Sequence, residues 1–211
     1  MILHGYWRSG AAYRVRIALA LKGLAYDQIN HDLRTGAQGD ADYAALNPQR
    51  LVPTLVAGET VLTQSSAILE WLEETHPDPA LLPADPAARA IVRAMVAIIG
   101  ADTHPLHNLR VVKALGELGA DAVAVQQWTA RWIGAGFAAL EPMIARHGRG
   151  FAFGDTPTLA DCFLVPALYS AERFSVDLAP YPALIAAGET ARGLPAVASA
   201  HPSRQPDADP A

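Results

Sequence analysis

The spacing of hydrophobic residues changes about a third of the way along the chain. In the first part, short alternating stretches are interleaved with stretches in which apolar residues recur every three or four positions. The strands that this pattern predicts are residues 2–6, 26–29, 54–56 and 60–62. The predicted helices are residues 10–22, residues 40–46, and one that opens at Ser65 and stops before Pro77. The order of these elements predicts a small α/β domain.

Beyond residue 86 the apolar residues follow the 3.6-residue period of a helix almost everywhere. The clearest positions are Ile91, Val92, Met95, Ile98 and Ile99 in one run, and Val125, Trp128, Trp132, Phe137 and Leu140 in another. Thr158 and Asp161 match a capping box at the start of a further helix. This part predicts an all-helical bundle, with a Pro- and Asp-rich tail from His201 to Ala211 that is expected to be frayed.

Four prolines between His76 and Pro86 separate the two patterns. Such a composition is typical of a semi-rigid linker. We therefore expect an α/β domain over residues 1–80, a linker over residues 81–86 and a helical domain over residues 87–211.

The acidic charge balance argues against a nucleic-acid-binding protein. The chain has 16 Lys and Arg against 21 Asp and Glu, a net charge of −5. All the basic residues except Lys22 and Lys113 are arginines, whose planar guanidinium binds carboxylates in a bidentate way. The arginines either favour an organic acid as ligand or reflect a GC-rich coding sequence, which the abundant alanine also suggests.

Cys162 is the only cysteine, which excludes an intramolecular disulfide and any CxxC redox or zinc site. His104 and His107 lack a third ligand at a suitable spacing, so no metal site is expected. No signal peptide is recognisable, and the longest apolar stretch is far shorter than the ~20 residues of a membrane span. We expect a soluble, cytoplasmic protein.

Three short segments could bind a ligand. Ser9 lies where the first predicted strand turns into a helix, and the N-terminus of a helix favours an anion such as a thiolate. Val52-Pro53 precedes a strand, where an ordinary proline is favoured over a cis bond that would expose the Val52 backbone. Gln64 and Ser65 open a helix and suit an α-amino-acid carboxylate. A plain helix cap is the favoured interpretation of Ser9 from this turn alone, and a plain cap explains Ser65 equally well.

Together these segments resemble the zeta-class glutathione transferases. The resemblance rests on residues 6–19, on Asn47-Pro48 with Val52-Pro53, on Gln64-Ser65 followed by residues 68–72, and on residues 153–161. It covers nearly the whole chain. Within that class the likeness is to the maleylpyruvate and maleylacetoacetate isomerases, through Thr103-His104-Pro105, Asn108, Arg110 and residues 171–174.

The resemblance implies a thioredoxin-like N-terminal domain, a helical C-terminal domain, a homodimer and glutathione as cofactor. It implies a cis Val52-Pro53 bond that pairs with the cysteinyl backbone of glutathione. Ser9 and Gly10 would lie at its sulfur, and the other implied glutathione contacts are Gln49, Gln64, Ser65, His104 and Asn108. Typical members have Ser-Ser-Cys where this chain has Ser9-Gly10-Ala11, so only Ser9 and main-chain amides remain to stabilise the thiolate.

The implied reaction is cis–trans isomerisation of a maleyl oxo-acid, in which a thiolate adds to the double bond, the bond rotates and the thiolate leaves. Its anionic substrate needs cationic partners, and we expect Arg8, Arg110 and Arg173 to supply them, with Arg110 on one long helix with His104. Two alternatives stay open: a zeta-like transferase that conjugates or dehalogenates small electrophilic acids, and a non-catalytic binding module of the same fold.

Overall fold

A computed structural model describes residues 1–209 and divides the chain into two compact units. The first contains residues 1–80 together with the described part of residues 193–211, and the second contains residues 81–192.

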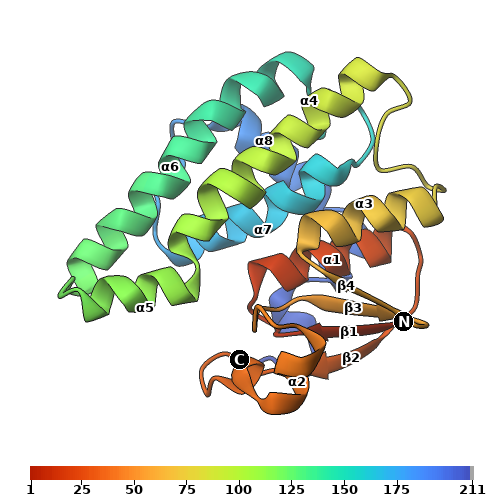
Figure 1. Ribbon diagram of the computed structural model, residues 1–211. Coiled ribbons are helices and arrows are strands. Elements are labelled where there is room, and N and C mark those ends of the chain that lie inside the picture. The colour runs from red at the N-terminus through yellow and green to blue at the C-terminus, as the bar shows by residue number, and fades with distance from the viewer. Residues whose placement is uncertain (210–211) are drawn as a thin grey trace. The chain divides into compact units, whose positions relative to one another are not determined.

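The first unit is built on a mixed four-stranded sheet, shown in Figure 1. Its strands are β1 (Ile2–Gly5), β2 (Asp27–Asn30), β3 (Thr54–Ala57) and β4 (Thr60–Thr63). Their order is β2-β1-β3-β4, with β1 and β2 parallel and the other two pairs antiparallel. All four predicted strands are confirmed, each with slightly shifted ends.

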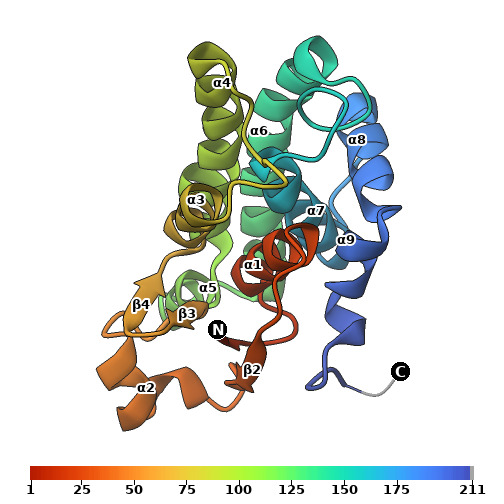
Figure 2. The ribbon, with the colours of Figure 1, turned by 90° about the vertical axis from the view of Figure 1, so that its right-hand side faces the viewer.

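Helix α1 forms the centre of the first unit. The helices of this unit are α1 (Gly10–Leu21), α2 (Ala41–Leu46), α3 (Ser65–Thr75) and α9 (Pro195–Ser199). Both α3 and α9 pack against α1, and in Figure 2 α1 lies between them. This explains why α1 is buried from Ala12 to Leu19, including Arg14 and Arg16.

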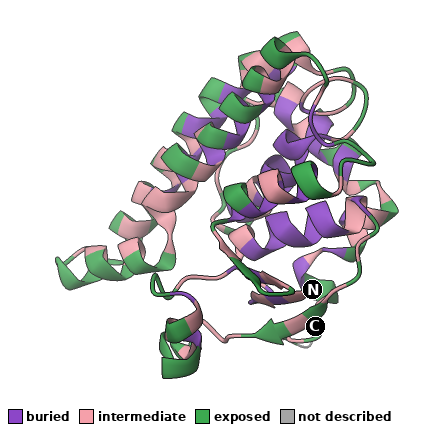
Figure 3. Cartoon of the chain, turned by 45° about the vertical axis from the view of Figure 1, so that its right-hand side comes forward, coloured by how far each residue is buried: buried purple, intermediate pink, exposed green. Residues whose placement is uncertain are grey.

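The second unit is helical, as predicted. Its α-helices are α4 (Pro86–Ala97), α5 (Leu109–Glu117), α6 (Ala122–His147), α7 (Leu159–Arg173) and α8 (Pro182–Arg192). Helix α7 packs on α4, α6 and α8 and is buried almost throughout; buried residues are purple in Figure 3. The predicted capping box at its start is confirmed: Thr158 Oγ1 accepts from the Ala160 amide, and Asp161 accepts from the Thr158 amide.

One helix prediction was wrong. His104 and Arg110 do not share a long helix, because α4 passes into a π-helical turn over Ile98–Thr103 and a 3-10 helix over His104–His107. Asn108 then adopts an extended conformation and caps α5, its side chain accepting from the Arg110 amide at 3.1 Å. Pro105 and this cap break the helical register.

The end of the chain also differs from expectation. The sequence assigned residues 87–211 to the helical domain, whereas Gly193 onward belongs to the first unit. The tail from His201 to Asp209 is not frayed in its described part, because it has a 3-10 turn at Pro202–Arg204 and side-chain bonds to the first unit. Residues 210 and 211 lie outside the described residues. In the described part of the chain, every helix is too short or too polar to cross a membrane.

A buried ion pair joins α1 to α3. Lys22 Nζ donates to Glu73 Oε2 at 2.8 Å and to the main-chain oxygens of His76 and Pro79 at 2.7 and 2.9 Å. The Lys22 side chain is 0% exposed and that of Glu73 is 6% exposed. The ammonium group thus has an acceptor for each of its three hydrogens.

We predict that Lys22→Met destabilises the protein by about 3–5 kcal/mol, because the buried Glu73 carboxylate would lose the ammonium group of Lys22. The matched control is Lys113→Met, at the exposed second lysine of the chain, whose effect should stay within about 0.5 kcal/mol. Chemical denaturation of both variants provides the measurement. Equal stabilities would contradict the prediction.

Two stacked histidines connect β1 to the chain beyond β2. His4 Nδ1 and His31 Nε2 are 3.0 Å apart, and the His31 ring lies 4.1 Å from that of Tyr43, centroid to centroid. Burial lowers the pKa of His4, and the nearby charge of His31 lowers it further. Burial lowers the pKa of His31, although Asp40 partly offsets it. Both rings therefore favour the neutral form in the folded protein.

We predict that the melting temperature falls as pH drops from 7 to 5. A base whose pKa is lowered by folding takes up protons first in the unfolded state, so stability is lost as pH falls through about 6.5, the ordinary histidine value. The double variant His4→Gln/His31→Gln should show a flatter pH dependence, whereas His147→Gln, in the helical unit, should keep the full slope. An unchanged slope in the double variant would exclude this pair as the cause.

Candidate functional site

The turn between β1 and α1 positions Ser9. The Ser9 amide donates to the Tyr6 carbonyl at 3.0 Å, and the Ser9 hydroxyl accepts from the Ala12 amide at 3.2 Å. Ser9 is therefore the N-cap of α1. A hydroxyl that accepts a hydrogen bond still has its own hydrogen to donate.

Capping and ligand binding are thus compatible at this turn. The amides of Gly10 and Ala11 lie in the first turn of α1, where the helix offers them no acceptor. They and the Ser9 hydroxyl together form a set of donors at the positive end of a helix dipole. This set suits a thiolate.

The loop before β3 is fixed through one carbonyl group. The Leu51 oxygen accepts from the hydroxyl of Tyr43 and from the side-chain amide of Asn47, both at 2.7 Å. The Val52-Pro53 bond that follows is cis. The interpretation of Pro53 as an ordinary proline at a strand start was therefore wrong, and the cis bond that the family resemblance implies is confirmed.

Gln64 and Ser65 lie at the start of α3. Gln64 occupies the cap position with a φ of 67°, a conformation that is uncommon for a non-glycine residue and is typical of functional sites. Its side-chain amide donates to Gln49 Oε1 at 2.6 Å, so two of the predicted contacts are neighbours. Ser65 is the first helical residue, which makes its interpretation as a plain N-cap wrong.

A buried arginine determines how Ser65 bonds. Arg14 Nη1 donates to Ser65 Oγ at 3.2 Å from the interior of the unit, where burial lowers the Arg14 pKa to about 9. Because a guanidinium only donates, Ser65 accepts from it and keeps its hydrogen for another acceptor. With the first amides of α3, this arrangement suits a carboxylate.

In the second unit, an aromatic contact joins the ends of two segments. The His107 ring lies 5.2 Å from that of His104 and 6.1 Å from that of Phe174. The guanidinium of Arg173 lies over Phe174 at 4.5 Å. Trp128 fixes this turn by donating to the Leu106 carbonyl at 2.7 Å. His104 and Arg173 therefore belong to one contact group.

The remaining predicted residues, Arg8, Asn108 and Arg110, differ in exposure. Arg110 lies in the first turn of α5 with an exposed side chain, and Asn108 is the cap of that helix. Arg8 is half-buried, with its guanidinium 5.2 Å from the Trp7 ring. Among residues 1–209, no three His, Cys, Asp or Glu side chains gather as a metal site.

Comparison with known proteins shows which family the chain belongs to. The model of the glutathione S-transferase N-terminal domain matches residues 8–75, and that of the C-terminal domain matches residues 126–196. The chain is 49% identical over 211 residues to a maleylpyruvate isomerase of a Ralstonia species, which covers 98% of this chain and 99% of the relative. The chain belongs to the glutathione S-transferase family.

Other relatives and solved structures agree. A maleylacetoacetate isomerase of Pseudomonas aeruginosa is 48% identical, with 98% of each chain covered. A holo structure of maleylpyruvate isomerase, described as a bacterial zeta-class enzyme, is 48% identical with a TM-score of 0.97 and covers 99% of this chain and 100% of its own. A maleylacetoacetate isomerase of Methylobacterium extorquens, solved with malonate and glutathione, is 39% identical with a TM-score of 0.96, with both chains covered completely.

The sequence did not predict the residues that hydrogen-bond to the site residues and their loop from within the unit. Arg14 is not among the predicted site residues, yet it bonds to Ser65. Tyr43 and Asn47 hold Leu51. The spacing of Arg14, four residues beyond the start of α1 and on its buried side, was a usable signal, because a buried arginine needs a polar partner nearby.

We predict that Ser65→Ala raises the dissociation constant for glutathione about tenfold or more, because a hydrogen bond to a charged group contributes about 1.5–3 kcal/mol. Ser66→Ala, at the exposed neighbouring position, is the matched control and should change affinity less than about twofold. Titration calorimetry measures both. Equal affinities would mean that the carboxylate is bound elsewhere.

Proposed function

We propose that this protein catalyses the glutathione-dependent cis–trans isomerisation of a maleyl oxo-acid, maleylpyruvate or maleylacetoacetate, to its fumaryl form. The observation that carries the proposal is the pair of helix N-termini in the first unit, where Ser9 on α1 and Ser65 on α3 each have a hydroxyl that accepts a hydrogen bond from the chain and keeps its own hydrogen to donate. It occurs in a chain that matches isomerases of both names over nearly its full length.

The donor set fits glutathione at two points. Ser65 and the first amides of α3 bind the α-carboxylate of the γ-glutamyl end, with Gln64 and Gln49 beside them. Ser9, Gly10 and Ala11 stabilise the sulfur at α1. The main chain at Val52 and Pro53 pairs with the cysteinyl unit, and His104 and Asn108 of the second unit are further contacts. Solved relatives hold glutathione alone, glutathione with malonate, and dicarboxyethyl glutathione with citrate.

When bound, glutathione supplies the thiolate that makes the substrate double bond temporarily single. The chain then has two tasks. The Ser9 hydroxyl and the α1 amides keep the sulfur ionised at neutral pH. Arg8, Arg110 and Arg173 bind the substrate carboxylates and the oxygen on which negative charge develops, where a fixed cation lowers the barrier. Arg173 is held for this role by its stacking on Phe174.

A conjugating or dehalogenating transferase is the alternative that uses the same residues. Both reactions need a thiolate and a bound small acid, and they differ in whether glutathione is consumed. A non-catalytic module is disfavoured, because the chain matches isomerases of both names over nearly its full length. The homodimer and the cytoplasmic location stay predictions.

The deciding experiment follows the absorbance of purified maleylpyruvate with and without glutathione, and then counts free thiols. Conversion to fumarylpyruvate that requires glutathione and leaves the thiol count unchanged supports the isomerase. Loss of thiol equal to loss of substrate identifies a conjugating transferase. If there is no reaction, the same assay is run with maleylacetoacetate, and failure with both substrates rejects the proposal.

We predict that Ser9→Ala lowers kcat by about 10²-fold, as removal of one preorganised donor does elsewhere. It should also destabilise the fold by about 1 kcal/mol, because Ser9 caps α1. Ser9→Thr keeps both the hydroxyl and the cap and should restore most of the rate. Turnover that is unchanged in Ser9→Ala would remove Ser9 from the mechanism.

A further inference from the structure

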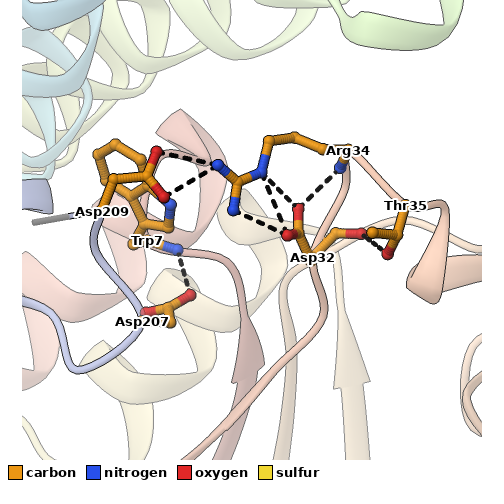
Figure 4. A network of polar contacts seen from close by, with 6 residues as sticks. All are labelled: Trp7, Asp32, Arg34, Thr35, Asp207 and Asp209. Carbon is orange, nitrogen blue, oxygen red and sulfur yellow. Dashed lines mark hydrogen bonds and ion pairs between the residues drawn. The ribbon is translucent and has the colours of Figure 1, made fainter.

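The C-terminal segment bonds directly to the turn that carries Ser9. Asp207 Oδ2 accepts from the main-chain amide of Trp7 at 2.9 Å, and its other oxygen accepts from the Gln28 side chain at 3.3 Å. Trp7 lies two residues before Ser9. Figure 4 shows the Asp207 carboxylate beneath the Trp7 amide.

A second carboxylate holds the same segment. Both Nη1 bonds of Arg34 to Asp209 are 2.9 Å long, and the other side of the Arg34 guanidinium bonds to Asp32. Arg34 thus lies between two acidic residues, as Figure 4 shows. The hydrogen bonds from Arg34, with a smaller effect of the Arg8 charge, lower the pKa of Asp32. Arg8, Asp32 and Arg34 are therefore charged groups around this turn along with Asp207 and Asp209.

The main-chain carbonyl of Trp7 is held by a side chain of α1. Arg16 Nη2 donates to the Trp7 carbonyl at 2.9 Å, and Arg16 Nε donates to the carbonyl of Ala200 at 3.1 Å. The Arg16 guanidinium therefore joins the turn to the C-terminal segment. Asp207 makes a second connection between them through the Trp7 amide. The Trp7 carbonyl thus accepts from Arg16, and the Trp7 amide donates to Asp207.

We propose that Asp207 is a positioning residue for thiolate stabilisation: by holding the Trp7 amide, it fixes the place of the Ser9 hydroxyl and the first amides of α1. This inference rests on the proposed function of Ser9. Stabilisation of an anion by fixed donors depends steeply on their distance, so a turn that moves stabilises the thiolate less. Asp207 bonds to the Trp7 amide and the Gln28 side chain, so its proposed effect on the sulfur is exerted through the turn.

The test compares Asp207→Ala with Asp207→Asn in the full chain. The alanine variant loses the acceptor, whereas asparagine keeps an oxygen for the Trp7 amide. Three quantities are measured: hydrogen exchange of the Trp7 amide without ligand, the pKa of the bound glutathione thiol from its thiolate absorbance, and kcat and KM across pH.

For Asp207→Ala we expect faster exchange at Trp7, a raised thiol pKa, and a kcat at neutral pH that is lower by about tenfold. The rate should recover at high pH, since there the thiol ionises without help. Asp207→Asn should restore all three quantities. An Asp207→Ala variant with wild-type exchange, thiol pKa and pH profile overturns the proposal, even when its melting temperature is lower.

Two further variants separate positioning from stability. Asp85→Ala removes a carboxylate that accepts from a main-chain amide at 2.8 Å at the start of α4, so it loses the same kind of bond elsewhere. It should lower the melting temperature without moving the thiol pKa. Gln28→Glu leaves Asp207 intact but sets a like charge beside it; it should shift the thiol pKa upward, and no shift would count against the proposal.

Failure of the function and of this inference are distinguishable. A wild-type protein that ionises bound glutathione but isomerises neither maleyl acid loses the proposed function, whereas the effect of Asp207 on the thiol pKa is still measured. A wild-type protein that does not bind glutathione overturns both.

Discussion

The guanidinium of Arg16 is the contact on which the arrangement of the first unit depends. It is 1% exposed and donates to main-chain oxygens of two segments that are nearly 200 residues apart in sequence, Trp7 and Ala200. A buried guanidinium is tolerated only when its hydrogens find acceptors, so these carbonyls must stay in place for the unit to be stable. The requirement of one side chain thereby fixes the turn before α1 and the segment after α9.

Arg14, two residues earlier, applies the same principle to α3. Its burial removes it from solvent, and Ser65 is an acceptor within its reach. Helix α1 therefore contacts the site in two ways: its first turn carries the Ser9 donor, and its buried side orients the Ser65 donor. The ligand-facing groups lie on helix ends, and the groups that orient them come from the interior.

Much of this could be predicted from the sequence. Period and turn signals located the four strands and helices α1, α2 and α3, but not α9. The capping pattern located the start of α7, because these features depend on neighbouring residues. The residues around Ser9 and Ser65 were identified as helix starts for the same reason. The capping pattern could not predict that Gln64, and not Ser65, occupies the cap position of α3. The bond from Arg14 to Ser65 could not be predicted either, because the two residues are distant in sequence.

The errors have two physical causes, one local and one long-range. The break between His104 and Arg110 requires knowing that Asn108 leaves the helical conformation, which the pattern of apolar residues does not record. The tail looked disordered because its composition is polar, yet its carboxylates are bound by Arg34 and the Trp7 amide. Local composition describes how a segment interacts with water, and it does not include long-range partners.

The return of the chain to its first unit has a consequence for biosynthesis. Residues 81–192 form a unit of their own between two pieces of the other one. During translation, therefore, α1 emerges long before α9, and Arg16 gains its Ala200 acceptor only after the whole helical unit has been made. The first unit is thus begun before the helical unit and completed after it, which ties the formation of its ligand site to the synthesis of residues 193–209.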